Sequence, residues 1–191
     1  MPAAKPGERR LQILQTLAQM LQHPVSEKIT TAALAKRLDV SEAALYRHFA
    51  SKAQMFEGLI EFIERTLFGL VNKITTEETS GAQQVDAIVS MLLGFAVKNQ
   101  GMTRVLIGDA LVNEDERLQA RINQLHDRLE SQLKQSLRFA VTQNELPPDT
   151  DAAAQANLII CYVVGRWHQY AKSGFKRSPL EYAEVQSKLL L

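Results

Sequence analysis

The stretch that decides the fold is TTAALAKRLDVSEAALYRHFASK, residues 30–52. It places Leu34 and Leu38 four residues apart, and it places Leu45 and Phe49 at the same spacing. Residues four apart lie on one face of a helix, so the stretch predicts two short helices, joined by a turn, that pack against each other. The outer face of the second helix then stays free, and the major groove of DNA admits one helix. The sequence therefore predicts a DNA-binding helix-turn-helix.

Polar residues precede both short helices. Thr30 or Thr31 can cap the first helix and Ser41 the second, because their hydroxyl oxygens accept hydrogen bonds from N–H groups that a first turn leaves unpaired. Asp39 lies at the turn, and aspartate is one of the few residues that tolerate left-handed backbone geometry.

Charge is unevenly distributed along the chain. Residues 1–60 contain eight Lys or Arg and five Asp or Glu, a net charge of +3, whereas the other 131 residues contain 14 and 16, a net charge of −2. The basic excess coincides with the predicted helix-turn-helix. A local positive charge of this kind is typical of a surface that binds nucleic acid.

Several residues of this region resemble the signature of the TetR family of DNA-binding regulators: Ser41, Leu45, Tyr46, His48, Phe49, Ser51, Lys52 and Phe56. The family usually has glycine where this chain has Asp39. The resemblance implies that Tyr46, His48 and Lys52 hold the DNA backbone, and phosphate contacts set register without reading sequence. The outward positions Glu42, Ala44 and Arg47 are the candidates for reading bases. The complete predicted DNA-binding set is Arg9, Arg10, Thr30, Thr31, Ser41, Glu42, Ala44, Tyr46, Arg47, His48 and Lys52, with Arg9 and Arg10 in a flexible N-terminal arm.

The remaining sequence predicts helices nearly throughout. Prolines mark the breaks, because a proline inside a helix removes a hydrogen bond and clashes with the preceding turn. We expect an all-α fold of about nine helices, with an N-terminal arm and helix-turn-helix domain at residues 1–50 and a helical C-terminal domain at 51–191. Outside the helix-turn-helix, the expected helices cover about residues 8–22, 51–74, 80–99, 101–108, 113–137 and 151–172, with a last one from the capping box Ser178-Pro179-Leu180-Glu181.

The stretch from Asp151 to Lys172 carries apolar residues over more than half of its circumference. They are Ala152, Ala153, Ala156, Ile159, Ile160, Val163, Val164, Trp167, Tyr170 and Ala171. A helix of a monomer this small normally keeps a polar half, so the pattern predicts a homodimer in which the last two long helices of each copy form a four-helix seam. The alternative is a helix at the centre of one core. Two-fold symmetry would present two recognition helices to a palindromic site.

A further resemblance extends past the helix-turn-helix. Residues 59–64, 92–106 and 115–125 resemble the nucleoid-occlusion branch of the TetR family. The resemblance implies a dimer that binds palindromic chromosomal sites and, when bound to DNA, engages the C-terminal tail of the division protein FtsZ and opposes Z-ring assembly. The implied partner site is Phe62, Met91, Gly94, Lys98 and Asn99, where lysine at position 98 replaces the arginine of the family. Each of these residues also has a structural alternative, as part of the core, of helix packing or of the solvated surface.

Two other functions are weighed against this one. In a TetR-type repressor released by a small inducer, Trp167, His168 and Tyr170 could line the inducer pocket, but aromatic residues make up only 6% of the chain. An enzyme would have to use the acids of residues 114–116, His126 with Asp127, or His168 with Cys161. Cys161 and His168 are roughly 10 Å apart along a helix, too far for proton transfer. No phosphate loop, metal-ligand spacing or nucleophile motif is present, so neither catalysis nor a cofactor or metal is expected.

Composition also bears on the cellular location. Cys161 is the only cysteine, which excludes an internal disulfide and suits a reducing cytoplasm. The N-terminal residues lack the apolar stretch of a secretory signal, and no apolar run approaches the roughly 20 residues of a membrane span. Composition therefore predicts a cytoplasmic protein, and the resemblance to the nucleoid-occlusion branch implies association with the nucleoid.

Overall fold

The computed structural model describes residues 6–22 and 29–191, and within these ranges the chain forms nine α-helices, one short 3₁₀ helix and no strand. The all-α prediction is confirmed. The break expected at Pro24 lies outside the described residues. The helices are α1 (Pro6–Gln22), α2 (Thr31–Arg37), α3 (Glu42–Tyr46), α4 (Lys52–Glu77), α5 (Gly81–Lys98), α6 (Gln100–Leu106), η1 (Asp109–Leu111), α7 (Glu116–Thr142), α8 (Ala152–Lys172) and α9 (Ala183–Leu190).

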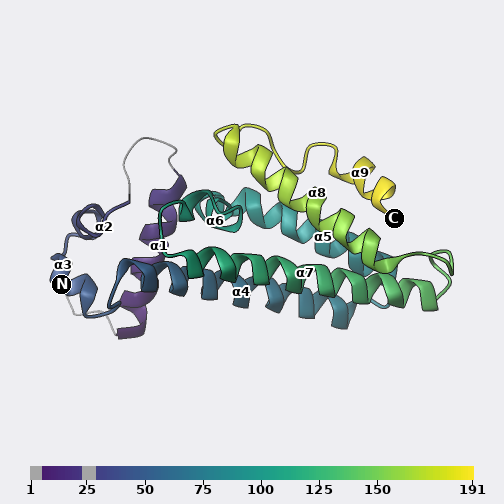
Figure 1. Cartoon of the computed structure of the whole chain (residues 1–191), viewed down its shortest axis with the longest axis horizontal. Coiled ribbons are helices and arrows are strands. Elements are labelled where there is room, and N and C mark those ends of the chain that lie inside the picture. Colours follow the sequence, from purple (N-terminus) through teal and green to yellow (C-terminus); the bar gives the residue numbers. More distant parts are fainter. Residues whose placement is uncertain (1–5, 23–28) are drawn as a thin grey trace.

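The molecule is elongated, and Figure 1 shows α1, α2 and α3 together at one end of it. The long helices α4 and α7 run beside each other along its length, and α8 packs on both α5 and α7. Helix α6 contacts α1, and so connects the small N-terminal helices to the larger bundle. The helix-turn-helix is therefore held at the tip of a helical body.

The long helices begin at the polar residues that the sequence indicated. The hydroxyl oxygens of Ser51 and Ser80 accept hydrogen bonds at 3.1 Å from the third residue of α4 and of α5, and Asp151 accepts two from the first turn of α8. At α4 the side chain of Gln54 completes the cap by accepting from the N–H of Ala50 at 2.9 Å. Helix α7 begins one residue after Asp115, which caps it.

The core follows from the spacing of leucines and isoleucines. Along α7, six apolar residues spaced three and four apart are all buried: Leu118, Ile122, Leu125, Leu129, Leu133 and Leu137. In α1 the buried apolar residues are Ile13, Leu17, Ala18 and Leu21, whereas Leu11 is 42% exposed.

The wide apolar arc of α8 has a different explanation from the one its sequence favoured. Ile159, Ile160, Val163, Trp167 and Tyr170 are all buried within a single copy of the chain. The indole N–H of the fully buried Trp167 donates a hydrogen bond of 3.0 Å to the carbonyl of Leu92 on α5. These residues belong to the core of one protomer, so the alternative reading of α8 as a central helix is correct for them.

The capping box predicted for the last helix is wrong. Residues 179–182 form turns, Tyr182 has a left-handed backbone (φ 63°), and α9 begins only at Ala183. Arg166 on α8 holds these turns, because its guanidinium donates hydrogen bonds to the carbonyls of Ser178, Pro179 and Glu181 at 2.6 to 3.3 Å. The carbonyl of Ser178 also accepts a 3.2 Å hydrogen bond from the N–H of Glu181, which closes a turn instead of the i+4 bond of a helix.

Candidate DNA and partner interfaces

The helix-turn-helix has the predicted caps and turn. Thr30 rather than Thr31 caps α2, accepting a 3.1 Å hydrogen bond from the N–H of Ala33, and Ser41 caps α3, accepting one of 3.2 Å from Ala44. Asp39 adopts the left-handed conformation, with φ 54°, which a turn between two helices requires. Leu34 and Leu45 are buried against each other's helices.

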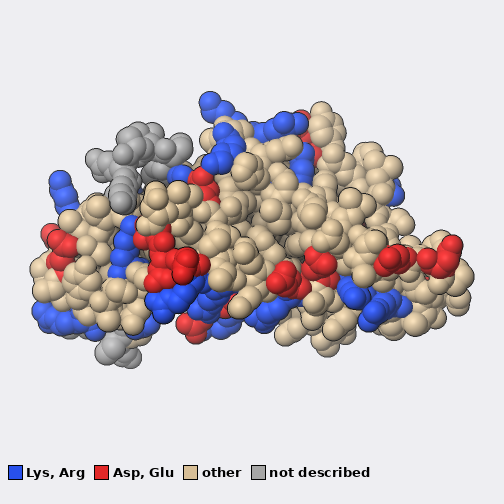
Figure 2. All heavy atoms as spheres, viewed as in Figure 1, with Lys and Arg blue, Asp and Glu red and all other residues tan. Residues whose placement is uncertain are grey.

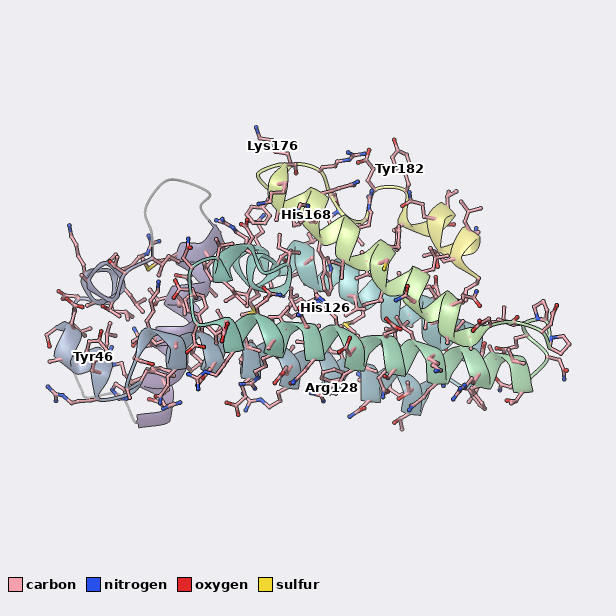
Figure 3. All side chains as sticks on the ribbon, in the orientation of Figure 1. Tyr46, His126, Arg128, His168, Lys176 and Tyr182 are labelled. Atoms are coloured by element: carbon pink, nitrogen blue, oxygen red, sulfur yellow. The ribbon has the colours of Figure 1, made fainter. Side chains whose placement is uncertain are left out.

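The outer face of α3 is open to solvent at the tip of the molecule. Tyr46, the last residue of α3, is 45% exposed, and Figure 3 places it at the end farthest from α8. Glu42 and Arg47 are also exposed, while Ala44 and His48 are half-buried. The hydroxyl of Thr31 donates a 2.6 Å hydrogen bond to the Glu42 carboxylate, which links α2 to the start of α3. The exposed side chains among them, Glu42, Tyr46 and Arg47, are open to solvent on this face.

The two N-terminal arginines are part of helix α1, and their assignment to a flexible arm was wrong. Arg10 donates a 2.6 Å hydrogen bond to the carbonyl of His48, and its guanidinium lies 4.2 Å from the centre of the Phe49 ring. Arg9 lines a small cavity of about 260 Å³ together with Arg47 and His48. The fold thus brings α1 beside the end of the recognition helix, and Figure 2 shows Lys and Arg side chains along one edge of this end.

Lys52 is held in a contact that sequence reasoning missed. It is the first residue of α4, and its ammonium group forms an ion pair with the carboxylate of Glu114, in the loop between α6 and α7. No local pattern links two residues that are 62 positions apart. Lys52, which the family resemblance implies as a phosphate ligand, is therefore paired with a carboxylate in this structure.

The expected partner residues lie along the hairpin of α4 and α5. Phe62, Met91, Gly94 and Asn99 are half-buried and Lys98 is exposed. No atom lies within 4 Å of the position that a Cβ of Gly94 would occupy, so the surface is open at this point. The amide of Asn99 donates a 2.9 Å hydrogen bond to the carbonyl of Phe95, which fixes the end of α5. An apolar surface with a basic edge can accept an extended acidic peptide.

A groove of about 670 Å³ lies between α7 and α8 on another side of the bundle. Its walls include His126, Glu130, Cys161, Gly165 and His168, and Figure 3 shows His126 at α7 facing the space beside α8. The neighbouring Leu158 is 56% exposed. Of the side chains considered for an enzyme, His126, Cys161 and His168 line this groove, whereas Asp127 and the acids of residues 114–116 are not among its lining residues. The described residues contain no group of three that could hold a metal ion.

His126 gives this region a dependence on pH. Burial lowers the pKa of its imidazole below the ordinary value of 6.5, and a hydrogen bond with the backbone of Leu106 offsets this effect only in part. The unfolded chain then binds the proton more tightly than the folded chain. The contribution of neutral His126 to stability is present above about pH 6.5 and is lost as the pH falls through the lowered pKa.

We therefore expect the unfolding temperature of the wild type to fall between pH 7 and pH 5 by more than that of His126→Phe. Thermal unfolding followed by circular dichroism across this pH range measures the difference. His168→Gln changes an exposed histidine of the same groove and should keep the pH dependence of the wild type. An equal dependence in His126→Phe and the wild type would contradict this prediction.

The aromatic residues considered for an inducer pocket do not line one cavity. Trp167 is fully buried, His168 is exposed, and the hydroxyl of Tyr170 accepts a 3.1 Å hydrogen bond from the amide of Gln100. Tyr170 also packs edge-on against the ring of Phe175, with 5.1 Å between the ring centres. Two of these three side chains therefore stabilise the fold, which does not favour the inducer alternative.

Family models match both parts of the chain. Residues 15–59 match the bacterial regulatory proteins of the tetR family, and residues 80–191 match the tetracyclin repressor-like C-terminal domain of SlmA-like proteins. Two solved structures share the fold at low identity. A TetR transcription regulator from Haloarcula marismortui gives a TM-score of 0.81 at 14% identity, covering 96% of each chain. The fatty acid degradation regulator FadR from Bacillus halodurans gives 0.80 at 17%, covering 98% of this chain and 96% of that one.

The helix-turn-helix and the helical body thus define the class of the protein, a DNA-binding regulator of the TetR type. Relatives of higher sequence identity define the family within this class. The nucleoid occlusion factor SlmA of Alteromonas mediterranea is 54% identical over 186 residues, which cover 97% of this chain and 95% of that protein. SlmA of a Marinomonas species is 52% identical over 177 residues, 93% and 90% of the two chains. The chain belongs to the SlmA family of nucleoid occlusion factors.

Proposed function

We propose that this protein binds palindromic chromosomal DNA as a homodimer and that its DNA-bound form engages the C-terminal tail of FtsZ, so that Z-ring assembly is opposed over the nucleoid. The observation that carries this proposal is full-length similarity to SlmA proteins in a chain whose recognition helix is exposed. The location that follows is the nucleoid. None of the helices in the described ranges combines the length and apolar character of a bilayer span.

DNA binding uses the exposed end formed by α1, α2 and α3. Tyr46, His48, Arg9 and Arg10 are within reach of the backbone of a duplex that lies against α3, and they set its register. The hydroxyl caps Thr30 and Ser41 add contacts from the helix starts, where N–H groups favour phosphate. The outward-facing residues that read bases are Glu42, Ala44 and Arg47.

We expect Tyr46→Phe to weaken binding to all sequences alike, by about tenfold per half-site, because the phenol O–H donates to a charged phosphate. The salt dependence should not change, since the substitution removes no charge. Titrations with a palindromic site and with a scrambled duplex at several salt concentrations measure both quantities. Tyr182→Phe removes a hydroxyl from a 65% exposed tyrosine at the start of α9 and is the matched control. A loss confined to one sequence would assign Tyr46 to base reading instead.

Dimerisation uses the groove between α7 and α8. The exposed residues of α8 in and beside this groove include the apolar or small Leu158, Cys161 and Gly165, together with the polar Asn157, His168 and Gln169. A second copy related by two-fold symmetry can cover such a surface. The seam is thus formed by the outer face of α8 and not by the buried residues that its sequence pattern emphasised. Two copies joined in this way present two recognition helices to the half-sites of one palindrome.

The FtsZ tail binds along α4 and α5. Phe62 and Met91 supply apolar contacts, Gly94 allows a backbone to approach, and the ammonium group of Lys98 attracts a carboxylate. Lysine acts as a point charge here, without the bidentate geometry of arginine. This surface and the helix-turn-helix are built by different helices, so one molecule can bind both partners at once.

The decisive experiment is a pull-down of purified FtsZ by the protein alone, with a palindromic duplex and with a scrambled duplex. We expect FtsZ to be retained most strongly with the palindromic duplex. FtsZ lacking its C-terminal tail is the control and should not be retained. Equal retention with and without DNA would reject the dependence on DNA, and no retention in any condition would reject FtsZ as the partner.

A further inference from the structure

We infer that Glu114 is a positioning residue for DNA binding and that it acts through Lys52. While DNA is absent, the Glu114 carboxylate neutralises the ammonium group of Lys52. The inference rests on the proposed DNA binding and adds Lys52, which the resemblance to the TetR family implies as a phosphate ligand, to its phosphate anchors. It assigns to the loop between α6 and α7, far from α3 in the sequence, a part in setting the affinity for DNA.

The ion pair of Lys52 and Glu114 joins the helix-turn-helix to the helical body. Lys52 begins α4 directly after the helix-turn-helix, and Glu114 precedes the capping residue of α7. The two side chains are 24% and 14% exposed, so water and salt reach the pair only in part. A partly shielded pair is screened less than one on the open surface.

The loop that carries Glu114 is anchored on both sides. At its start, the carboxylate of Asp109 is held by Arg104 of α6 at 2.6 Å and by Lys172 of α8. Burial alone would raise the pKa of Asp109, but hydrogen bonds from Lys172 and Arg104 outweigh it and lower that pKa, so the anchor is charged at neutral pH. Glu114 itself follows the left-handed Asn113, and its N–H donates a 3.0 Å hydrogen bond to Leu111. The Glu114 carboxylate is therefore kept beside Lys52.

A paired ammonium group attracts a phosphate less than a free one does. Lys52 can bind the DNA backbone only by leaving Glu114 or by sharing its three N–H donors between the carboxylate and a phosphate. In the first case the ion pair is lost, and in the second two negative groups lie near each other. In both cases Glu114 reduces the contribution of Lys52 to DNA affinity and to the release of counterions.

Glu114→Gln tests the inference, because the amide keeps the shape of the side chain and removes its charge. We expect tighter binding to every DNA sequence, by about eightfold per protomer at 0.1 M salt, and a slope of log K against log salt that is steeper by about 0.9 per protomer. Glu116→Gln is the matched control, since it removes the same charge two residues away from an exposed side chain in the first turn of α7. Its effect on the slope should be clearly smaller.

Lys52→Met, made in the wild type and in Glu114→Gln, shows whether Glu114 acts through Lys52. We expect Glu114→Gln to steepen the slope only when Lys52 is present. An equal effect of Glu114→Gln and Glu116→Gln, or an effect of Glu114→Gln that persists without Lys52, would overturn the inference while leaving the proposed DNA binding intact. A slope that stays unchanged when Lys52→Met is added to Glu114→Gln would overturn the phosphate role of Lys52 itself. Circular dichroism of each variant verifies that it is folded.

Discussion

Leu158→Glu is expected to convert the dimer into a monomer and to weaken binding to a palindromic site by about a hundredfold or more. In the dimer, binding of one recognition helix raises the effective concentration of the other at the second half-site, and a monomer loses this gain. Leu158 lies on the outer face of α8 and is 56% exposed within one protomer. The substitution therefore places a charge in the proposed seam between copies without disturbing the core. Analytical ultracentrifugation gives the mass, and titration of the palindromic and half-site duplexes gives the affinities.

One control variant makes this result specific. Leu189→Glu introduces the same charge at a 79% exposed leucine of α9, outside the α7–α8 groove, and should leave the dimer intact. Val163→Glu is unsuitable, although the sequence pattern suggested that position, because Val163 is fully buried and the variant would unfold the protomer. A dimer that persists in Leu158→Glu would place the seam elsewhere.

The second large effect is expected at the partner surface. Gly94→Trp should fill the open space on α5, and Lys98→Glu should replace the attracting charge by a repelling one. We expect each variant to lower the affinity for the FtsZ tail by about a hundredfold or more, because like charges or a blocked apolar surface cost several kcal/mol in an interface. Fluorescence anisotropy of a labelled tail peptide, measured with palindromic DNA present, gives the affinity.

Matched variants separate the surface from the fold. Gly94→Ala adds only a Cβ to a position with no atom within 4 Å and should bind the tail normally. Lys73→Glu makes the same charge reversal at an exposed lysine of α4 and should also be neutral. Both loss variants should keep DNA affinity within about twofold, since separated sites usually behave independently. Normal tail binding by Gly94→Trp and Lys98→Glu would exclude this surface.

Local patterns predicted most of the fold because the features they report are local. Ser41, Ser51 and Ser80 cap the helices that follow them, since a cap needs only N–H groups two or three residues away. Asp39 forms the left-handed turn for the same reason. The capping box predicted at Ser178 does not start a helix. There a distant side chain, Arg166, donates a hydrogen bond to the Ser178 carbonyl, and no local pattern encodes that contact.

The sequence by itself determined the all-α class and the helix-turn-helix, because these depend on the spacing of residues along the chain, and it indicated the family through the resemblance of its motifs. Only the tertiary structure decided which apolar residues of α8 are core and which are surface, since Leu158 and Val163 are both aliphatic and differ in what packs on them. Tertiary structure likewise decided that Arg10 lies beside His48 and that Lys52 meets Glu114. Contacts between residues so distant in the chain depend on how whole helices pack, and no local spacing encodes them.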